Sequence, residues 1–168
     1  AVDMGWDMPT YLLAATLRPE TVYGQTNFWA HPEVEYVQVK AEDEYWIMSR
    51  PAAEKLSYQV DGLEIVGVVS GLELLGKECS APGVGRQIPV LPAIFCDPDV
   101  GTGLVTSVPS DAPVDWIALR DLQRSAEVCQ KYGLSRERVC SIEPIPIIKS
   151  KGYGSLPAVE ICEKLGIE

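Results

Sequence analysis

Histidine is almost absent from this chain, and its cysteines lack the spacing of a metal site or a disulfide scaffold. His31 is the only histidine and its proline neighbour predicts a loop, which argues against Ser-His-Asp catalysis. No Cys-x-x-Cys pair joins the five widely spaced cysteines, Cys79, Cys96, Cys129, Cys140 and Cys162. We expect reduced, mostly buried thiols, and no metal or cofactor bound by this chain.

Positive charge and long apolar runs are also scarce. The sequence has 14 Lys and Arg against 24 Asp and Glu, which gives a net charge of −10. This charge opposes broad binding to nucleic-acid duplexes. No run approaches the ~18 apolar residues of a membrane span, and residues 1–8 do not read as a signal peptide. With 168 residues, 46% of them hydrophobic, the sequence predicts one cytoplasmic domain without membrane contact.

Short segments rich in β-branched and aromatic residues dominate the secondary-structure pattern. Prolines and glycines separate them at intervals typical of small barrels, which predicts an α/β fold: a central β-barrel of short strands with several peripheral helices. The expected strands are Tyr11–Ala15, Val34–Lys40, Tyr45–Met48, Leu63–Val69, Ile88–Leu91, Gly103–Val108 and Ile145–Ile148.

Three helices are expected from their start and stop signals. Two short ones begin at serine and proline pairs, from Ser49 to Leu56 and from Ser155 to Leu165 with Gly166 as its stop. The longest is expected from Ser110 or Asp111 to about Lys131, ending at Gly133, with Asp111 as its cap. A packing stripe should run along its face through Trp116, Leu119, Leu122 and Ala126.

Two polar segments stand out against this pattern. Thr16-Leu17-Arg18-Pro19-Glu20-Thr21, with Tyr23-Gly24-Gln25-Thr26-Asn27 close behind, places hydroxyls, a guanidinium and a carboxylate on one short segment after a strand. The stretch from Gly101 to Asp115 repeats this design with a glycine-flanked strand, an acidic turn and a helix start. We expect the two segments to face each other across a cleft.

These segments, TLRPETVYGQTN and GTGLVTSVPSDAPVD, together resemble the editing domain (connective polypeptide 1) of leucyl-tRNA synthetases of the archaeal and eukaryotic-cytosolic type. The resemblance covers essentially the whole chain, so residues 1–168 are expected to form a single editing domain. Neither the HIGH-type nor the KMSKS-type signature of class I synthetases occurs. The resemblance therefore implies an insertion excised from a larger enzyme, whose missing synthetic domain binds ATP and Mg. Alone, the domain is expected to be monomeric.

By this resemblance, Asp115 binds the α-ammonium of a mischarged amino acid. We expect a surface carboxylate in the first turn of a helix, kept ionised by the helix dipole; the plainer alternative is a helix-start acid. Thr16 would border the ester and position water or ribose, or else simply end a strand. Thr21 would limit the side-chain pocket and block leucine.

Three further positions complete the comparison with the family. Thr106 would line the amino-acid pocket. Arg18 would contact the acceptor-end phosphate or the loop around Gly101, or else pair with Glu20 in a structural bridge. Leu17 stands where bacterial relatives usually place a second threonine, so a hydroxyl role cannot be transferred there.

The resemblance implies hydrolytic proofreading: removal of norvaline, isoleucine or methionine from tRNA-Leu after transfer. Its partners would be the noncognate amino acid, the tRNA acceptor end and the rest of the synthetase. The sequence shows no general base, so positioning of an already activated ester would have to suffice; a threonine nucleophile would need an adjacent base. The alternatives are a valyl- or isoleucyl-type editing domain and an inert module that docks the acceptor end.

Overall fold

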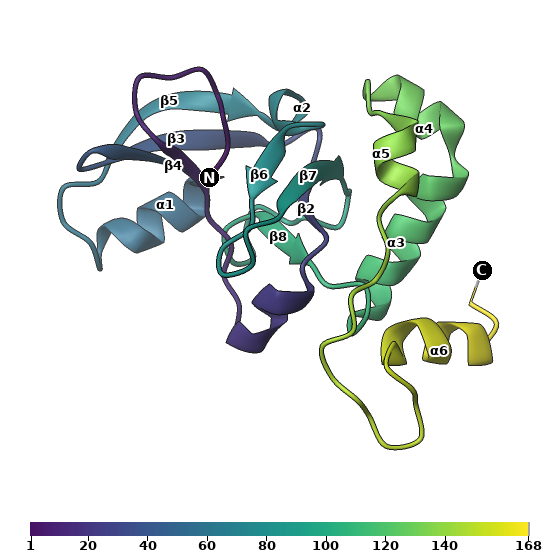
Figure 1. The fold of residues 1–168 in the computed structure, drawn as a ribbon. Coiled ribbons are helices and arrows are strands. Elements are labelled where there is room, and N and C mark those ends of the chain that lie inside the picture. Colours follow the sequence, from purple (N-terminus) through teal and green to yellow (C-terminus); the bar gives the residue numbers. More distant parts are fainter. Residues whose placement is uncertain (168) are drawn as a thin grey trace.

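Eight strands form two four-stranded mixed sheets in the computed structural model, which describes residues 1–167 (Figure 1). The first sheet has the order β1 (Thr10–Leu12), β4 (Glu44–Ser49), β3 (Glu35–Ala41) and β5 (Glu64–Ser70). The second has the order β6 (Glu78–Ser80), β7 (Gln87–Pro92), β2 (Asn27–Ala30) and β8 (Leu104–Ser107). β1 pairs with β4 and β2 with β7 in parallel, and all other pairs are antiparallel.

The two sheets enclose a common core. Val2 forms bridges to both Thr10 and Cys79 and so joins β1 to β6, while the Ser49 N–H donates to the Thr102 carbonyl at 2.8 Å. Apolar side chains from both sheets pack in between, including Phe28, Tyr36, Ile47, Val69, Ile88 and Leu104. The predicted α/β fold centred on short strands is confirmed, with the strands hydrogen-bonded as two sheets that share this core.

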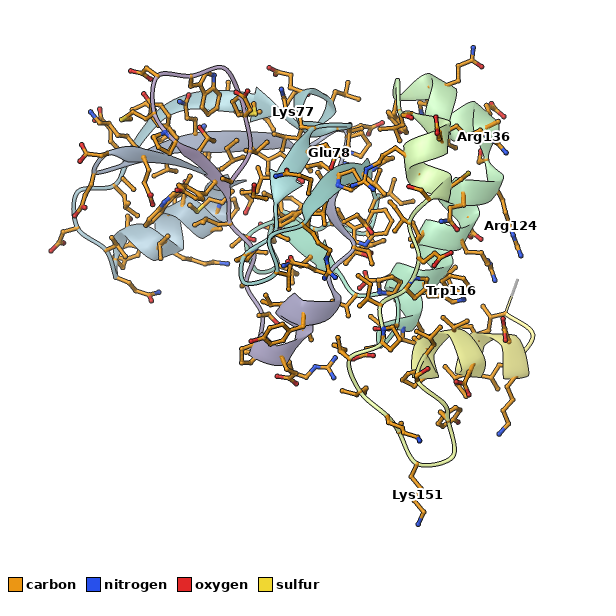
Figure 2. The ribbon with its side chains drawn as sticks, in the orientation of Figure 1. Lys77, Glu78, Trp116, Arg124, Arg136 and Lys151 are labelled. Carbon is orange, nitrogen blue, oxygen red and sulfur yellow. The ribbon has the colours of Figure 1, made fainter. Side chains whose placement is uncertain are left out.

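The helices lie outside this β core. α3 (Pro113–Arg124), α4 (Ala126–Lys131) and α5 (Arg136–Cys140) stand in a column beside the second sheet, and α6 (Pro157–Lys164) packs against α3 (Figure 1). Arg138 of α5 ties this column to the sheet through Glu78, labelled in Figure 2, with Nε 2.8 Å from Oε1. The other helices are the 3-10 helix η1 (Pro19–Gly24), α1 (Arg50–Ser57) and α2 (Gly71–Leu74).

The single long helix expected up to Lys131 is wrong, because the chain breaks at Ser125. Its φ of −99° and ψ of 97° are not helical, and its hydroxyl accepts from the Val128 N–H to cap α4. Leu119 and Leu122 are buried as predicted, whereas Ala126 is exposed beyond the break. The stop at Gly133 is confirmed by its positive φ of 63°.

The strand expected at Ile145–Ile148 is also wrong. This stretch belongs to an extended loop before α6, and Lys151 lies at the loop's far end (Figure 2). Pro144 and Pro146 flank Ile145, and a proline cannot donate a ladder hydrogen bond. Five elements were not expected at all, namely η1, β2, β6, α2 and α5.

The structural roles expected of the cysteines and of His31 are confirmed. All five cysteines are free thiols, and only Cys140 is exposed. His31 follows β2 in a loop, where its Nδ1 accepts from the Glu33 N–H at 3.1 Å. Within residues 1–167 no helix has the length and apolar character needed to cross a membrane.

Candidate functional site

One cavity of about 340 Å³ brings together every site residue that the sequence predicted. The segment before β2 contributes Thr16, Arg18 and Thr21, while β8 and the start of α3 contribute Thr106 and Asp115. The predicted meeting of the two polar segments is therefore observed. The rest of the lining is Ala15, Leu17, Val22, Val105, Val108, Asp111 and Ala112.

The wall formed by the loop at Thr16 is held by its own short-range hydrogen bonds. The Thr21 hydroxyl donates to the Arg18 carbonyl at 2.7 Å, so its proton is engaged. The Thr16 Oγ1 accepts from the Arg18 N–H at 3.1 Å and has only long contacts for its own proton, 3.3 Å to the Arg18 carbonyl and 3.4 Å to the Thr21 Oγ1. The Thr16 hydroxyl is thus the freer donor of the two.

Two contacts hold the far end of this loop against the β core. The Arg86 guanidinium donates to the Tyr23 carbonyl at 2.7 Å. A Cβ at Gly24 would lie 2.9 Å from the Ile147 Cγ2 and 3.0 Å from the Val108 Cγ1, so only glycine permits this close approach. Arg18 is exposed, and among residues 1–167 its guanidinium forms no ion pair, so the alternative of a bridge to Glu20 is not realised.

The opposite wall is built around a buried carboxylate. Asp115 lies in the first turn of α3, as predicted, but only 6% of its surface is exposed, so the expectation of a surface carboxylate is wrong. Its Oδ1 accepts from the Trp29 Nε1 at 3.0 Å, and its Oδ2 accepts from the Val108 N–H at 2.8 Å. Both oxygens are therefore fixed from the protein side while the residue lines the cavity.

Burial dominates the electrostatics of this carboxylate. Desolvation raises the pKa of Asp115 above its ordinary value of 3.8, and the hydrogen bonds from Val108 and Trp29 oppose that rise. Behind the wall, burial raises the pKa of the Cys96 thiol to about 12, and the Asp115 charge adds to the effect. A carboxylate that is buried away from water is stabilised when a cation binds beside it.

Asp111 does not cap α3, contrary to the sequence prediction. The cap position is Ala112, and no side chain accepts a hydrogen bond there. The Asp111 Oδ1 is buried and has no hydrogen-bond partner among residues 1–167, although the residue lines the cavity. Sequence reasoning also missed Trp29, whose only local signal was a tryptophan in a short apolar run.

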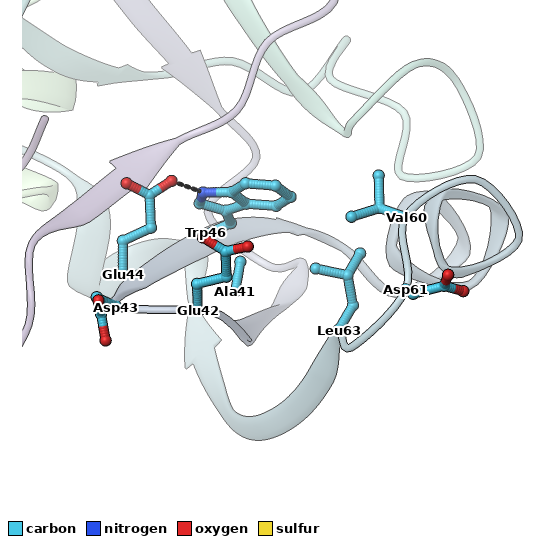
Figure 3. Close-up of a pocket in the computed structure, with 8 residues that line it drawn as sticks. All are labelled: Ala41, Glu42, Asp43, Glu44, Trp46, Val60, Asp61 and Leu63. Carbon is cyan, nitrogen blue, oxygen red and sulfur yellow. Dashed lines mark hydrogen bonds between the residues drawn. The ribbon is translucent and has the colours of Figure 1, made fainter.

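Two other hollows are present, and only one of them borders the site. A larger one of about 730 Å³ shares Thr16, Val22 and Thr106 with the site and is lined by the aromatic residues Tyr11, Phe28 and Trp46. A separate one of about 370 Å³, at the β3–β4 hairpin, is acidic (Figure 3). It contains none of the predicted site residues. Its lining is Ala41, Glu42, Asp43, Glu44, Trp46, Val60, Asp61 and Leu63.

No feature of the cavity suggests a metal ligand set. Among residues 1–167 no group of three or more His, Cys, Asp or Glu side chains is placed to hold an ion. The polar groups that line the cavity are instead three threonine hydroxyls, the Arg18 guanidinium, and the carboxyl groups of Asp111 and Asp115. Such a set can orient an ester and a cationic group in one small volume.

No protein-family model matches this chain, but leucine–tRNA ligases align with nearly its whole length. The chain is 46% identical over 158 residues to a leucine–tRNA ligase of Methanothermobacter thermautotrophicus and 48% over 162 residues to that of Pyrococcus horikoshii. It is 42% identical over 165 residues to the cytoplasmic leucine–tRNA ligase of Pongo abelii. These matches cover 94% of this chain but only 14–17% of the ligases.

Solved structures agree with these relatives. The crystal structure described as GlLeuRS-CP1 matches 98% of this chain and 66% of its own, with a TM-score of 0.90 and 39% identity. The editing domain of a Plasmodium falciparum cytosolic leucyl-tRNA synthetase has the same fold, with a TM-score of 0.87 and 22% identity. The chain thus belongs to the connective polypeptide 1 editing domains of leucyl-tRNA synthetases, of the archaeal and eukaryotic-cytosolic type.

Proposed function

We propose that this chain hydrolyses the ester bond of noncognate amino acids, such as norvaline, isoleucine or methionine, that have been attached to tRNA-Leu. The observation that carries the proposal is the cavity itself, where threonine hydroxyls on one wall face a buried carboxylate on the other. A synthetic site separates side chains that differ by one methylene by only ~1–3 kcal/mol. A second site that hydrolyses the mischarged products raises the accuracy beyond this limit.

Asp115 is the anchor for the substrate's α-ammonium in this proposal. Each carboxylate oxygen can accept about two hydrogen bonds, and the protein uses one on each, from Trp29 and Val108. The remaining lone pairs are available to an ammonium in the cavity. Because desolvation penalises the isolated anion, a cation bound beside it recovers much of that cost.

Thr16 is the group nearest the ester in this arrangement. Its hydroxyl has only weak internal partners, so it can turn to hold the attacking water or the terminal ribose. Aminoacyl esters are already activated, so a fixed water and a stabilised oxyanion suffice for hydrolysis. Among residues 1–167 no histidine, lysine or glutamate lines the cavity, which argues against a threonine nucleophile with its own base.

Thr21 is the gate that protects leucine. Its hydroxyl proton is engaged by the Arg18 carbonyl, which fixes the side chain at the cavity wall. A fixed side chain excludes a branched chain by contact, and a linear chain such as that of norvaline avoids it. Thr106 lines the opposite side of the same pocket.

The tRNA end enters over the exposed loop. Arg18 is exposed and unpaired among the described residues, so its guanidinium is available to an acceptor-end phosphate. The larger neighbouring cavity opens from Thr16 and carries aromatic faces, which suit the terminal nucleoside. With a net charge of −10, the chain depends on the rest of a synthetase to hold the tRNA body.

The test is deacylation of norvalyl- and leucyl-tRNA-Leu by this chain and by the longer ligase that contains it. We expect norvalyl-tRNA-Leu to be cleaved and leucyl-tRNA-Leu to be spared. Preferential cleavage of threonyl-tRNA-Val would favour a valyl-type domain. Binding of the acceptor end without cleavage by either protein would favour an inert docking module.

A further inference from the structure

Trp29 lies directly behind the site without being part of its lining. It is fully buried in β2, where its backbone pairs in register with Val105 of β8, a residue that does line the cavity. Its ring packs among buried side chains of the second sheet and of the helices beside it, including Leu91 and Leu119. It also contacts the Phe95 ring edge to face, with ring centroids 5.8 Å apart. A ring enclosed in this way has little freedom to rotate.

The polar end of this ring is aimed at the proposed anchor. The Trp29 Nε1 is 3.0 Å from the Asp115 Oδ1, and the two residues are 86 positions apart in the chain. The second oxygen is held by a backbone N–H, that of Val108, at 2.8 Å. The carboxylate is therefore held by the buried ring of Trp29 in β2 and by the backbone N–H of Val108, directly after β8.

We propose that Trp29 is a positioning residue for the editing reaction: its indole N–H holds the Asp115 carboxylate in the orientation that presents its free lone pairs to the α-ammonium of the substrate. This inference rests on the proposed function of Asp115. Trp29 itself touches no substrate, since it does not line the cavity. Its effect passes through the carboxylate alone.

The alternative is that the bond merely satisfies a buried indole. The two cases differ when the indole N–H is removed and the ring is kept. A purely structural bond would change folding stability and leave the reaction's pH dependence alone. A positioning bond stabilises the ionised carboxylate, so its loss moves the acid limb of the reaction to higher pH.

The charged groups around Asp115 define the control for this readout. Arg18 lines the cavity from the Thr16 loop and Asp111 from the turn before α3, and the Cys96 thiol, whose pKa burial raises to about 12, lies on the core side. Asp111 is the other carboxyl group that lines the cavity. Asp115→Asn separates the two, because the amide oxygen still accepts from the indole but carries no charge.

The first experiment follows the indole N–H resonance of Trp29 in this chain by NMR as the pH is varied. We expect the resonance to shift with the ionisation of Asp115, whose pKa burial raises above its ordinary value of 3.8, and the shift to vanish in Asp115→Asn. A resonance that does not respond, or that responds equally in Asp115→Asn, would overturn the proposal. This measurement needs no hydrolytic activity, so it tests the coupling between the indole and the carboxylate separately from the proposed function.

The second experiment measures norvalyl-tRNA-Leu deacylation in the longer ligase. Trp29→Phe should lower kcat/KM about ten- to a hundredfold, as expected for a hydrogen bond to a charged group, and shift the acid limb upward. Phe95→Leu, which disturbs the same packing without touching the bond, should stay within about twofold of wild type. A Trp29→Phe enzyme with wild-type rate and pH profile would contradict the inference. Should that variant not fold, the NMR titration decides. A wild-type ligase without deacylation would instead refute the proposed function.

Discussion

The two walls of the cavity are built in opposite ways. The Thr16–Thr21 wall is mostly exposed, and its hydroxyl bonds reach only two to five residues along the chain. The Asp115 wall is buried, and its carboxylate is tied to Trp29 across 86 residues. One wall is held by bonds within its own short segment, while the other is fixed by the core.

This difference suggests a division of labour. A buried, doubly bonded carboxylate costs little reorganisation when a cation arrives, so it suits the role of a fixed anchor. The Thr16 hydroxyl, which has only long contacts, can instead turn toward an ester, while the engaged Thr21 limits the amino-acid side chain. The comparison predicts that changes at Asp115 abolish the reaction, whereas changes at the threonines redirect it.

The largest effect is expected from Asp115→Asn. The variant keeps the bond from Trp29, removes the charge and gives up the bond from the Val108 N–H, which its amide nitrogen cannot accept. Norvalyl-tRNA-Leu deacylation should therefore fall at least a hundredfold, as for a lost buried ion pair of about 3–5 kcal/mol. Asp115→Ala is the less clean test, because it also leaves two buried donors unpaired at about 1–3 kcal/mol each. Deacylation rates in the longer ligase measure the effect, and circular dichroism checks the fold. Wild-type rates in a folded Asp115→Asn enzyme would rule out the anchor.

Thr21→Ala should redirect the reaction. Loss of the methyl and hydroxyl makes room for about one more carbon, so leucyl-tRNA-Leu should be cleaved about ten- to a hundredfold faster, with norvalyl-tRNA-Leu little changed. Paired deacylation rates on the two substrates measure the change, and Thr106→Ala serves as the matched variant on the opposite wall. Leucyl-tRNA-Leu that stays intact in Thr21→Ala would transfer the gate to Thr106.

The fixed wall should also reveal itself in stability. Because burial raises the pKa of Asp115 above 3.8, the folded state holds its proton more tightly than the unfolded state does. The contribution of this group to stability is therefore greatest below pH 3.8 and falls as the pH rises through the folded pKa. Urea unfolding of wild type and Asp115→Asn at pH 4 and pH 7 should show the variant gaining relative stability at pH 7. A difference independent of pH would contradict a raised pKa.

Asp111→Ala tests whether the second carboxyl group belongs to the fold or to the cavity. Its Oδ1 has no partner among the described residues, so its removal should leave the free energy of unfolding unchanged or slightly higher. A capping residue would instead lose about 1 kcal/mol on the same change. Chemical denaturation distinguishes the two outcomes, and a loss of that size would restore the capping role.

The smallest effect is expected from chelation. Dialysis of the protein against EDTA, followed by assay in the standard buffer, should leave deacylation unchanged, because the cavity is lined by hydroxyl, guanidinium and carboxyl groups without a ligand cluster. Elemental analysis provides the independent check. Stoichiometric zinc, with activity lost on dialysis and restored by zinc, would contradict a site that works without a metal.

The Thr16–Thr21 wall could be predicted from the sequence, and the Asp115 wall only in part. Thr16, Arg18 and Thr21 lie within one short segment, so a local pattern identifies them together. Asp115 was identified through the family resemblance and its place at a helix start, but its burial was missed, because the covering residue Trp29 is far away in the chain. Local patterns do not encode which distant ring covers a helix start.

The fold shows the same limit. Helix α1 was predicted from the serine, arginine and proline at its start, and Ser49 does cap it by accepting from the Ala52 N–H. The break at Ser125 was missed because Leu122 and Val128 continue an apolar pattern across it. Ile145–Ile148 has strand-like composition, yet its prolines prevent pairing. In both failures, backbone hydrogen bonding overrode a side-chain pattern.

The most direct test of the account is the binding of an uncleavable substrate analogue, norvaline joined by an amide to 3′-amino-3′-deoxyadenosine. We predict that NMR shift changes appear on both walls, at the Thr16 and Thr21 amides and at the Trp29 indole, and that Asp115→Asn abolishes binding. Changes confined to one wall, or found instead at Asp43 and Asp61 of the acidic hollow, would contradict the claim that the two walls form a single editing site.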